Sequence, residues 1–129
     1  MKHKLEIERC KIIVFAQIKG INDDKKLKFI LDTGASKTII DEVSAFILGY
    51  DLKKLDAGDR LMTAGGGVNS KVVRLPKFSL FGKDMINFKV SVLKMPPQIT
   101  YFVDGIVGMD FLLQFKRIKF DFAEKTVEI

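Results

Sequence analysis

The segment Phe29-Ile30-Leu31-Asp32-Thr33-Gly34-Ala35-Ser36 is the part of the sequence that decides the fold. Its apolar start predicts a buried strand, and this strand runs directly into Asp32. The arrangement places a carboxylate at a strand end that little water can reach. Gly34 has no side chain, so the backbone can pass close to this carboxylate and donate N–H bonds to it. The plainer alternative is that Asp32 only caps a turn.

A weak repeat of this pattern occurs near the C-terminus, at Gly105-Ile106-Val107-Gly108-Met109-Asp110. It is again an apolar strand that runs into a glycine-containing turn, with a capped helix downstream. The doubling suggests two similar halves in one small β domain. We expect Asp110 to cap the following helix, and the alternative is that it is a catalytic partner of Asp32.

The rest of the sequence predicts mainly β-structure with one or two short helices. Apolar and β-branched runs predict the strands, and clusters rich in Gly, Asn and Asp predict the turns between them. Asp41 is a good N-cap for a helix that ends at Gly49. The segment 95–98 contains two prolines and should form a loop. The expected strands cover residues 5–8, 11–19, 26–31, 38–40, 60–75 (two strands around Ala64-Gly65-Gly66-Gly67), 78–80, 86–93, 105–108, 117–122 and 126–129, and the expected helices cover residues 42–48 and 111–115.

Length and composition narrow the possible chemistry. The 129 residues, of which 47% are hydrophobic, suit one globular domain over residues 1–129. The single cysteine, Cys10, excludes an intrachain disulfide and a Cys-rich zinc module. The only histidine, His3, lies near a terminus, so a triad or metal site built on histidine would rest on a frayed residue. We expect Cys10 in the core and His3 in solvent, and any acid–base catalysis must come from carboxylates.

The net charge of +6 raises nucleic acid as a partner. Lysine accounts for 18 of the 22 basic residues, which are scattered singly or in pairs without an Arg-rich or aromatic-interleaved run. A solvated, lysine-rich surface explains this pattern better, so we expect no nucleic-acid partner. No apolar run is long enough for a signal peptide or a membrane helix. We therefore expect a soluble, cytoplasmic protein with no membrane partner.

Taken with its surroundings, Asp32-Thr33-Gly34-Ala35-Ser36 resembles the retropepsin-like aspartic proteases, including their single-domain bacterial members. The tripeptide alone is a weak signal. The context adds an apolar strand before it, the Ala-Ser pair after it and a glycine-rich hairpin downstream. The Gly105–Gly108 element followed by Asp110-Phe111-Leu112 also fits the family. The resemblance covers roughly residues 11–129.

This resemblance implies a mainly β fold, a small closed β-barrel lobe of the acid-protease type with a glycine-rich flap hairpin. It also implies a role for each matching residue, with no metal and no cofactor. The implied catalytic residues are Asp32, Thr33 and Gly34, the implied substrate-binding residues are Ala35, Ala64, Gly65, Gly66 and Gly67, and the residues implied to support the site are Ile106, Val107 and Gly108.

Only one Asp-Thr-Gly is present, whereas the two-lobed pepsins carry two in a longer chain. A retropepsin-like chain completes the site by pairing with itself around a two-fold axis, so that each subunit gives one Asp32. Two carboxylates that share one proton can activate a water and protonate the carbonyl oxygen. The implied function is a homodimeric aspartic endopeptidase acting on a peptide or protein, with Thr33 reaching across to the partner loop. The alternative is a peptide- or protein-binding module that keeps the fold without catalysis.

Two features bear on how such an enzyme would work. Relatives with serine in place of Ala35 have a hydroxyl that can hydrogen-bond to the ionised aspartate, and Ala35 lacks it. We therefore expect a working pH between mildly acidic and near neutral. The glycines at 65–67 would let a flap close over the peptide and exclude water, although an ordinary hairpin turn is the alternative reading. The expected pocket residues are mostly apolar, which indicates hydrophobic side chains flanking the cut.

Overall fold

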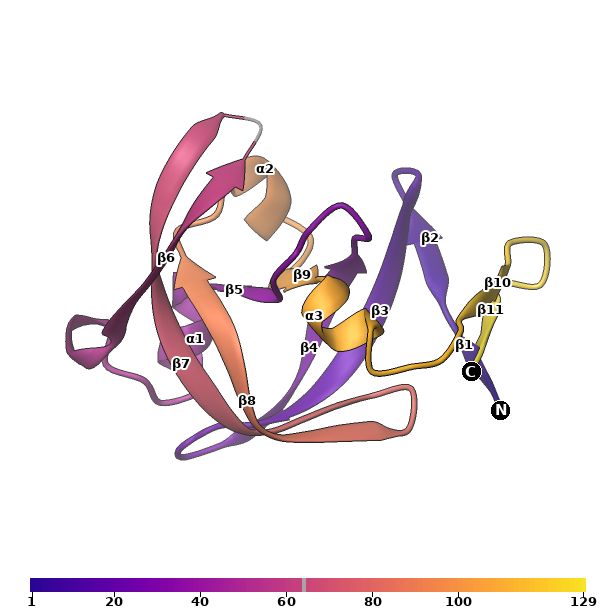
Figure 1. Ribbon diagram of the computed structural model, residues 1–129, viewed down its shortest axis with the longest axis horizontal. Helices are drawn as coiled ribbons and strands as arrows, with labels where there is room; N and C mark the ends of the chain where they lie inside the picture. The colour runs from indigo at the N-terminus through magenta and orange to yellow at the C-terminus, as the bar shows by residue number, and fades with distance from the viewer. Residues whose placement is uncertain (64) are drawn as a thin grey trace.

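The computed structural model describes residues 1–63 and 65–129, which form mainly β-structure (Figure 1). Short helices lie between some of the strands. The strands are β1 (Lys2–Lys4), β2 (Glu6–Glu8), β3 (Lys11–Lys19), β4 (Asp24–Leu31), β5 (Ile39–Asp41), β6 (Asp56–Thr63), β7 (Gly66–Leu80), β8 (Lys83–Leu93), β9 (Gly105–Val107), β10 (Lys119–Asp121) and β11 (Thr126–Glu128). The helices are α1 (Glu42–Ile47), the 3₁₀ turn η1 (Leu52–Lys54), α2 (Pro97–Thr100) and α3 (Met109–Leu112).

The main sheet closes into a ring, in the order β3-β4-β9-β5-β8-β7. It closes because β3 pairs with β4 along one edge and with β7 along the other, where Gln17 lies opposite Ser79. Strand β2 extends the sheet beyond β3, and β6 extends it beyond β7. The expected mainly β lobe with a flap-type hairpin is confirmed.

The two sequence repeats lie side by side in this ring. Strand β4 of the first repeat runs parallel to β9 of the second, with Phe29 opposite Gly105 and Leu31 opposite Val107. A side chain at Gly105 would collide with the carbonyl oxygen of Ile39 and the ring of Phe29, so only glycine lets β9 fit between β4 and β5. The ends of the two repeats are thereby brought together.

Aromatic side chains fill the centre of the ring. Phe78 is fully buried, and its ring contacts those of Phe29, Phe88 and Phe111 at centroid distances of 5.6, 5.2 and 5.3 Å. These rings come from β4, β7, β8 and α3, so one cluster joins both repeats. Their tilted and edge-on packing is the favoured geometry for aromatic pairs.

Helix α1 forms where the sequence predicts it. The Asp41 carboxylate accepts a hydrogen bond from the N–H of Val43 at 3.1 Å, and Gly49 has a φ of +102° just after the helix. The other oxygen of Asp41 accepts from the N–H of Met95 at 2.9 Å. This cap therefore also ties α1 to the segment that follows β8.

Several boundaries differ from the sequence prediction. Residues 78–80 continue β7 and do not form a separate strand, and left-handed residues Phe81 and Gly82 turn the chain into β8. Residues 97 and 98, the second half of the loop expected at 95–98, instead begin α2, because a proline in the first helical turn loses no hydrogen bond there. Helix α3 covers residues 109–112 instead of 111–115, and its N-cap is Gly108.

Both ends of the chain lie in a small second sheet, in the order β1-β11-β10 (Figure 1). His3 lies opposite Val127 there, and its half-buried ring is 5.6 Å from that of Phe81, so the prediction of a solvated terminal histidine is wrong. Cys10 is exposed in the β2–β3 turn with a φ of +60°, so the prediction of a core cysteine is also wrong. No helix within residues 1–63 and 65–129 has the length and apolar character to cross a membrane.

Replacing Phe78 with alanine should lower the free energy of unfolding by about 3–5 kcal/mol, because it empties the centre of the aromatic cluster. Urea denaturation of both proteins measures this difference. The control is Ile86→Ala on the neighbouring strand β8, whose side chain is largely exposed, and it should change stability by less than about 1 kcal/mol. Equal losses in the two variants would contradict the central role of this cluster.

Candidate active site

Asp32 lies immediately after β4, in a turn that the neighbouring strand supports. Its backbone N–H donates to the carbonyl of Val107 at 3.0 Å, which continues the pairing of β4 with β9 by one residue. Its own carbonyl accepts from the N–H of Ala35 at 3.2 Å, closing a tight turn. The side chain is half-buried, whereas Thr33 and Gly34 are exposed at the tip of the loop. Backbone hydrogen bonds thus hold Asp32 in place, while its half-buried side chain stays in contact with solvent.

Gly34 contacts the carboxylate directly. Its N–H donates to Asp32 Oδ1 at 2.8 Å, and a Cβ at this position would lie 3.1 Å from the same oxygen. A larger residue would crowd the carboxylate that the backbone binds. The hydrogen bond from Gly34 fixes the orientation of the Asp32 carboxylate.

Backbone hydrogen bonds from the second repeat hold the Asp32 loop in place. The N–H of Met109 donates to the carbonyl of Ala35 at 2.8 Å, and the N–H of Asp110 donates to the carbonyl of Ser36 at 3.2 Å. Residue 108 has to be glycine at this contact, because a Cβ there would lie 2.6 Å from the carbonyl oxygen of Lys37. Val107 and Gly108 are buried and Ile106 is half-buried, so the predicted support element lies against the loop that holds Asp32.

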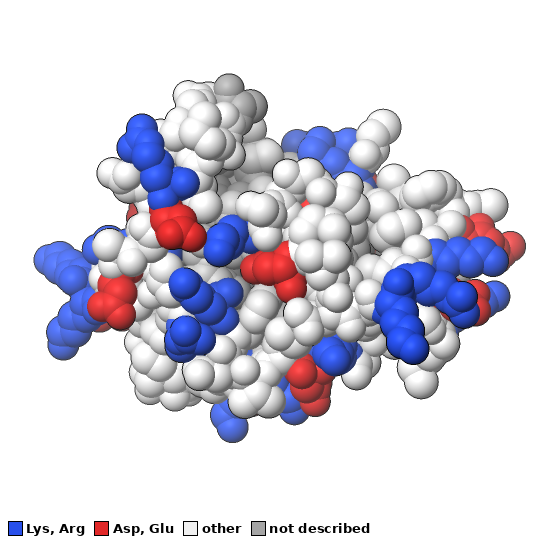
Figure 2. Space-filling model, in the orientation of Figure 1, with Lys and Arg blue, Asp and Glu red and all other residues white. Residues whose placement is uncertain are grey.

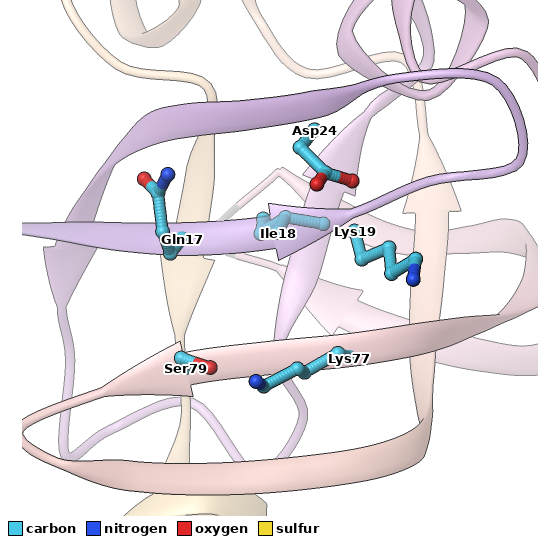
Figure 3. A pocket seen from close by; sticks show the side chains of 6 residues that line it. All are labelled: Gln17, Ile18, Lys19, Asp24, Lys77 and Ser79. Atoms are coloured by element: carbon cyan, nitrogen blue, oxygen red, sulfur yellow. The ribbon is translucent and has the colours of Figure 1, made fainter.

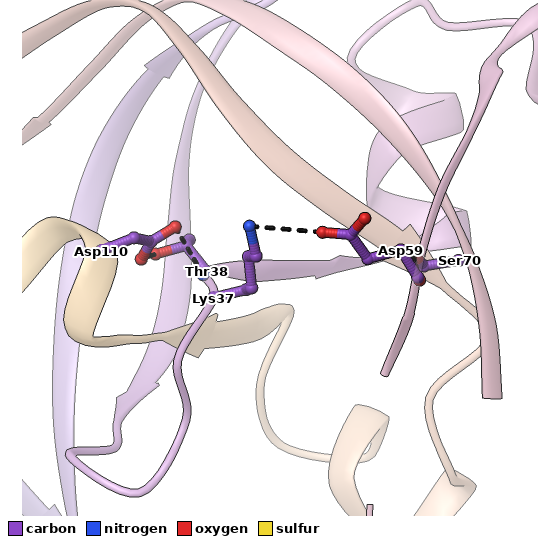
Figure 4. Close-up of polar contacts among 5 residues, drawn as sticks. All are labelled: Lys37, Thr38, Asp59, Ser70 and Asp110. Carbon is purple, nitrogen blue, oxygen red and sulfur yellow. Dashed lines mark hydrogen bonds and ion pairs between the residues drawn. The ribbon is translucent and has the colours of Figure 1, made fainter. Parts of the chain in front are cut away.

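A side-chain network joins Thr38 to Asp110 (Figure 4). The two oxygens of Asp110 accept from the N–H of Thr38 at 3.0 Å and from its hydroxyl at 2.7 Å. The same carboxylate accepts from the N–H of Phe111 at 2.8 Å, while the Thr38 hydroxyl accepts from the N–H of Gly108 at 3.2 Å. Thr38 is fully buried. Asp110 is therefore a positioning residue in the first turn of α3, and its oxygens are occupied by structural hydrogen bonds.

The β6–β7 hairpin stands on the same side of the ring as the Asp32 loop (Figure 1). A cavity of about 580 Å³ lies between the loop and β6. Its lining residues are Gly34, Ala35, Ser36, Lys37 and Ile39 from the loop and Asp59, Arg60, Leu61, Met62 and Thr63 from β6. Its volume lies in the range of ligand-binding pockets.

The glycine-rich tip of the hairpin, at residues 65–67, is not part of the lining of this cavity. Gly66 has a φ of +110°, Gly65 is exposed, and Ala64 lies outside the described residues. Arg60 lies across Gly67, donating to its carbonyl at 3.2 Å and to Asn69 Oδ1 at 3.1 Å. Of the described residues predicted to bind substrate, only Ala35 lines the cavity, alongside β6 residues that the sequence did not single out.

Another cavity, of about 230 Å³, lies where β3 meets β7 (Figure 3). Two of its lining residues already bind Asp84: the Ser79 hydroxyl donates to it at 2.6 Å, and the Lys77 ammonium lies 3.4 Å away. The hydrogen bond from Ser79 and the charge of Lys77 hold the pKa of the Asp84 carboxyl below its usual value. No residue of the Asp32 loop lines this cavity, so it is separate from the candidate site.

Comparison with known families agrees with this geometry. The family model described as aspartyl protease matches residues 16–111, which include both repeats and the hairpin. The chain belongs to this family. A comparison with curated protein sequences found no match to this chain.

Two solved structures share the fold. The structure of a retropepsin-like aspartic protease from Rickettsia conorii superimposes with a TM-score of 0.74 at 26% identity, covering 98% of this chain and 88% of that one. The EIAV protease, solved with the inhibitor HBY-793, gives a TM-score of 0.63 at 20% identity, covering 81% of this chain and 86% of that one. The retropepsin-like assignment made from the sequence is confirmed.

Replacing Thr38 with valine should destabilise this aspartyl protease by about 1–3 kcal/mol, because Asp110 and the N–H of Gly108 each lose a buried partner. Valine keeps the shape of the side chain, so the loss reports the hydroxyl. Thr38→Ser is the control, since it keeps the hydroxyl and should retain most of these bonds. Thermal or urea unfolding measures both, and a valine variant as stable as the serine variant would contradict the role of the network.

Proposed function

We propose that this chain is an aspartic endopeptidase that works as a homodimer, with residues 1–129 forming one protease domain and half of the active site. The observation that carries the proposal is the pairing of the two repeats. Leu31 lies opposite Val107, so the next residue is Asp32 in one repeat and Gly108 in the other. One chain therefore offers a single carboxylate at the site, and a second copy has to supply the other.

In such a dimer the two Asp32 carboxylates share one proton, because two negative charges in close contact cannot both stay ionised. The ionised carboxylate takes a proton from a water molecule, and the oxygen of that water attacks the carbon of the scissile amide. The protonated carboxylate gives its proton to the carbonyl oxygen, which forms a neutral tetrahedral diol. Return of a proton to the amide nitrogen then lets the C–N bond break and releases an amine and a carboxylic acid.

Other residues of the chain serve this reaction. Gly34 orients the Asp32 carboxylate through its N–H, and the exposed Thr33 lies where a partner loop can reach it. The Ile106–Gly108 element keeps the loop in place from within the same subunit. Ala35 contributes to the lining of the peptide cavity. The glycines at residues 65–67 let the hairpin tip close over the bound peptide.

Asp32→Asn should abolish cleavage of a peptide library, because an amide at this position can neither take nor give the proton. Mass spectrometry of the products measures this loss for both proteins. Equal product from the two would contradict the protease function. Peptide binding by both proteins without cleavage by either would instead identify the alternative, a binding module.

The same variant tests the dimer. When an equal amount of Asp32→Asn protein is equilibrated with wild-type protein, exchange of subunits should reduce the wild-type activity to about half, because only one dimer in about four then carries two Asp32 residues. A monomeric enzyme would keep its full activity. Light scattering on the mixture gives the molar mass, and a strict monomer at micromolar concentration would also contradict the proposal.

Ala35→Ser should shift the acidic limb of the pH–rate profile toward lower pH. A hydroxyl beside the Asp32 loop can donate to the ionised carboxylate and keep it charged in more acidic solution. The wild-type optimum is expected between mildly acidic and near-neutral pH. Measurements of kcat/KM against pH for the two proteins decide this, with Ala35→Gly as a control that adds no donor. A wild-type optimum below about pH 3.5 would contradict the expectation.

A further inference from the structure

One end of the 580 Å³ cavity is charged, unlike the apolar cleft expected from the sequence. Lys37 comes from the floor, five positions after Asp32, while Asp59 and Arg60 come from β6. Figure 4 shows Lys37 pointing toward Asp59, whereas the next residue, Thr38, points toward Asp110. The Lys37 ammonium thus takes no part in the Thr38–Asp110 network and pairs with Asp59 instead.

A β-bulge places the charged residues of β6. The pairing of β6 with β7 shifts register between Ala57 and Arg60. Gly58 fits this bulge because a Cβ would lie 2.6 Å from a methyl group of Val72, and the buried Ser70 hydroxyl donates to the carbonyl of Asp59. Bulges redirect side chains at functional sites, and here the redirected residues face the cavity.

The contacts of these groups leave positive charge uncompensated. Lys37 Nζ lies 3.4 Å from Asp59 Oδ2, and the two side chains are 41% and 68% exposed. An ion pair this exposed contributes little and exchanges partners readily. Arg60 binds only the neutral oxygens of Gly67 and Asn69, and no carboxylate among the described residues lies within 4.0 Å of it.

The other charged residues near this cavity do not cancel the positive charge of Lys37 and Arg60. A smaller cavity of about 230 Å³ is lined by Lys37 and Asp59 on one side and by Lys89 and Asp110 on the other. The Asp110 carboxylate is already held by hydrogen bonds from Thr38 and Phe111. Among the residues that line the two cavities, Lys37, Arg60 and Lys89 stand against Asp59 and Asp110, which leaves one excess positive charge.

We propose that Lys37 and Arg60 form a cationic subsite that selects peptides with an acidic side chain near the scissile bond. This inference rests on the proposed function and adds the class of substrate. A glutamate or aspartate of the peptide takes over Lys37 from Asp59 and gains charge-assisted hydrogen bonds from the two cations. Asp59 holds Lys37 in place when no peptide is bound and competes with the peptide for it.

The two-fold symmetry of the dimer predicts where along the peptide this preference occurs. Each subunit contributes one such subsite, and the two lie at equal distances from the axis that passes between the Asp32 residues. The acidic preference should therefore occur at two positions of the peptide, at equal or nearly equal distances on either side of the cut. A preference at one side only would contradict the assignment to a symmetric pair.

The test compares cleavage of matched peptides that carry Glu or Gln at each position near the cut. Wild-type protein should cleave the Glu peptide with a kcat/KM about fivefold higher. Lys37→Met should remove this preference, because methionine keeps the length of the side chain without its charge. Asp59→Asn should increase the preference, because it removes the competitor. Lys54→Met, a change of the same kind at an exposed residue outside the cavity, should leave it unchanged.

Binding of the same peptides to Asp32→Asn protein separates this inference from the proposed function. Cleavage by the wild type without a Glu preference, or an unchanged preference in Lys37→Met, would overturn the subsite and leave the protease function standing. Preferential binding of Glu peptides without any cleavage would support the subsite and overturn the protease function. A protein that neither cleaves nor binds the peptides contradicts both.

Discussion

The hydrogen bonds between Thr38 and Asp110 are the constraint on which the rest of the site depends. They join the loop after β4 to the first turn of α3, two segments that are far apart in the sequence. Thr38 is fully buried and Asp110 is half-buried, so breaking the contact leaves buried polar atoms without a partner, which costs more than the bond itself contributes. The Asp32 turn is held in place because this contact and the backbone bonds beside it leave the loop few other conformations.

The same contact orders the residues on either side of it. Toward the N-terminus, it holds the residue next to Lys37, and Lys37 and Ala35 both line the peptide cavity. Toward the C-terminus, it fixes α3, whose Phe111 belongs to the aromatic cluster. Packing in the core and geometry at the surface are thus connected through one half-buried carboxylate. Charged residues of both signs are mixed over the face shown in Figure 2, without a continuous basic stripe.

Much of this arrangement could be predicted from local patterns in the sequence. The strand before Asp32, the Asp41 cap with Gly49 and the apolar run at 105–107 each carry a signal within a few residues, and each forms as predicted. Thr38 was missed because its role depends on Asp110, and a lone threonine before an apolar pair gives no sign of such a partner. The direction of Asp59 and Arg60 depends on a bulge whose position follows from cross-strand contacts at Gly58 and Ser70. His3 and Cys10 were misjudged because their exposure depends on which distant segments cover them.

The closed ring also determines when the site can form during folding. Ring closure requires Gln17 to meet Ser79, and the Asp32 turn requires β4 to meet β9, so both depend on segments separated by roughly half of the chain. Contacts of this kind form late, because the entropy of a long loop has to be lost before they are gained. A partly folded chain therefore holds Asp32 in a flexible loop without its Val107 and Gly108 supports. The chain acquires its candidate site at the same step at which it finishes folding.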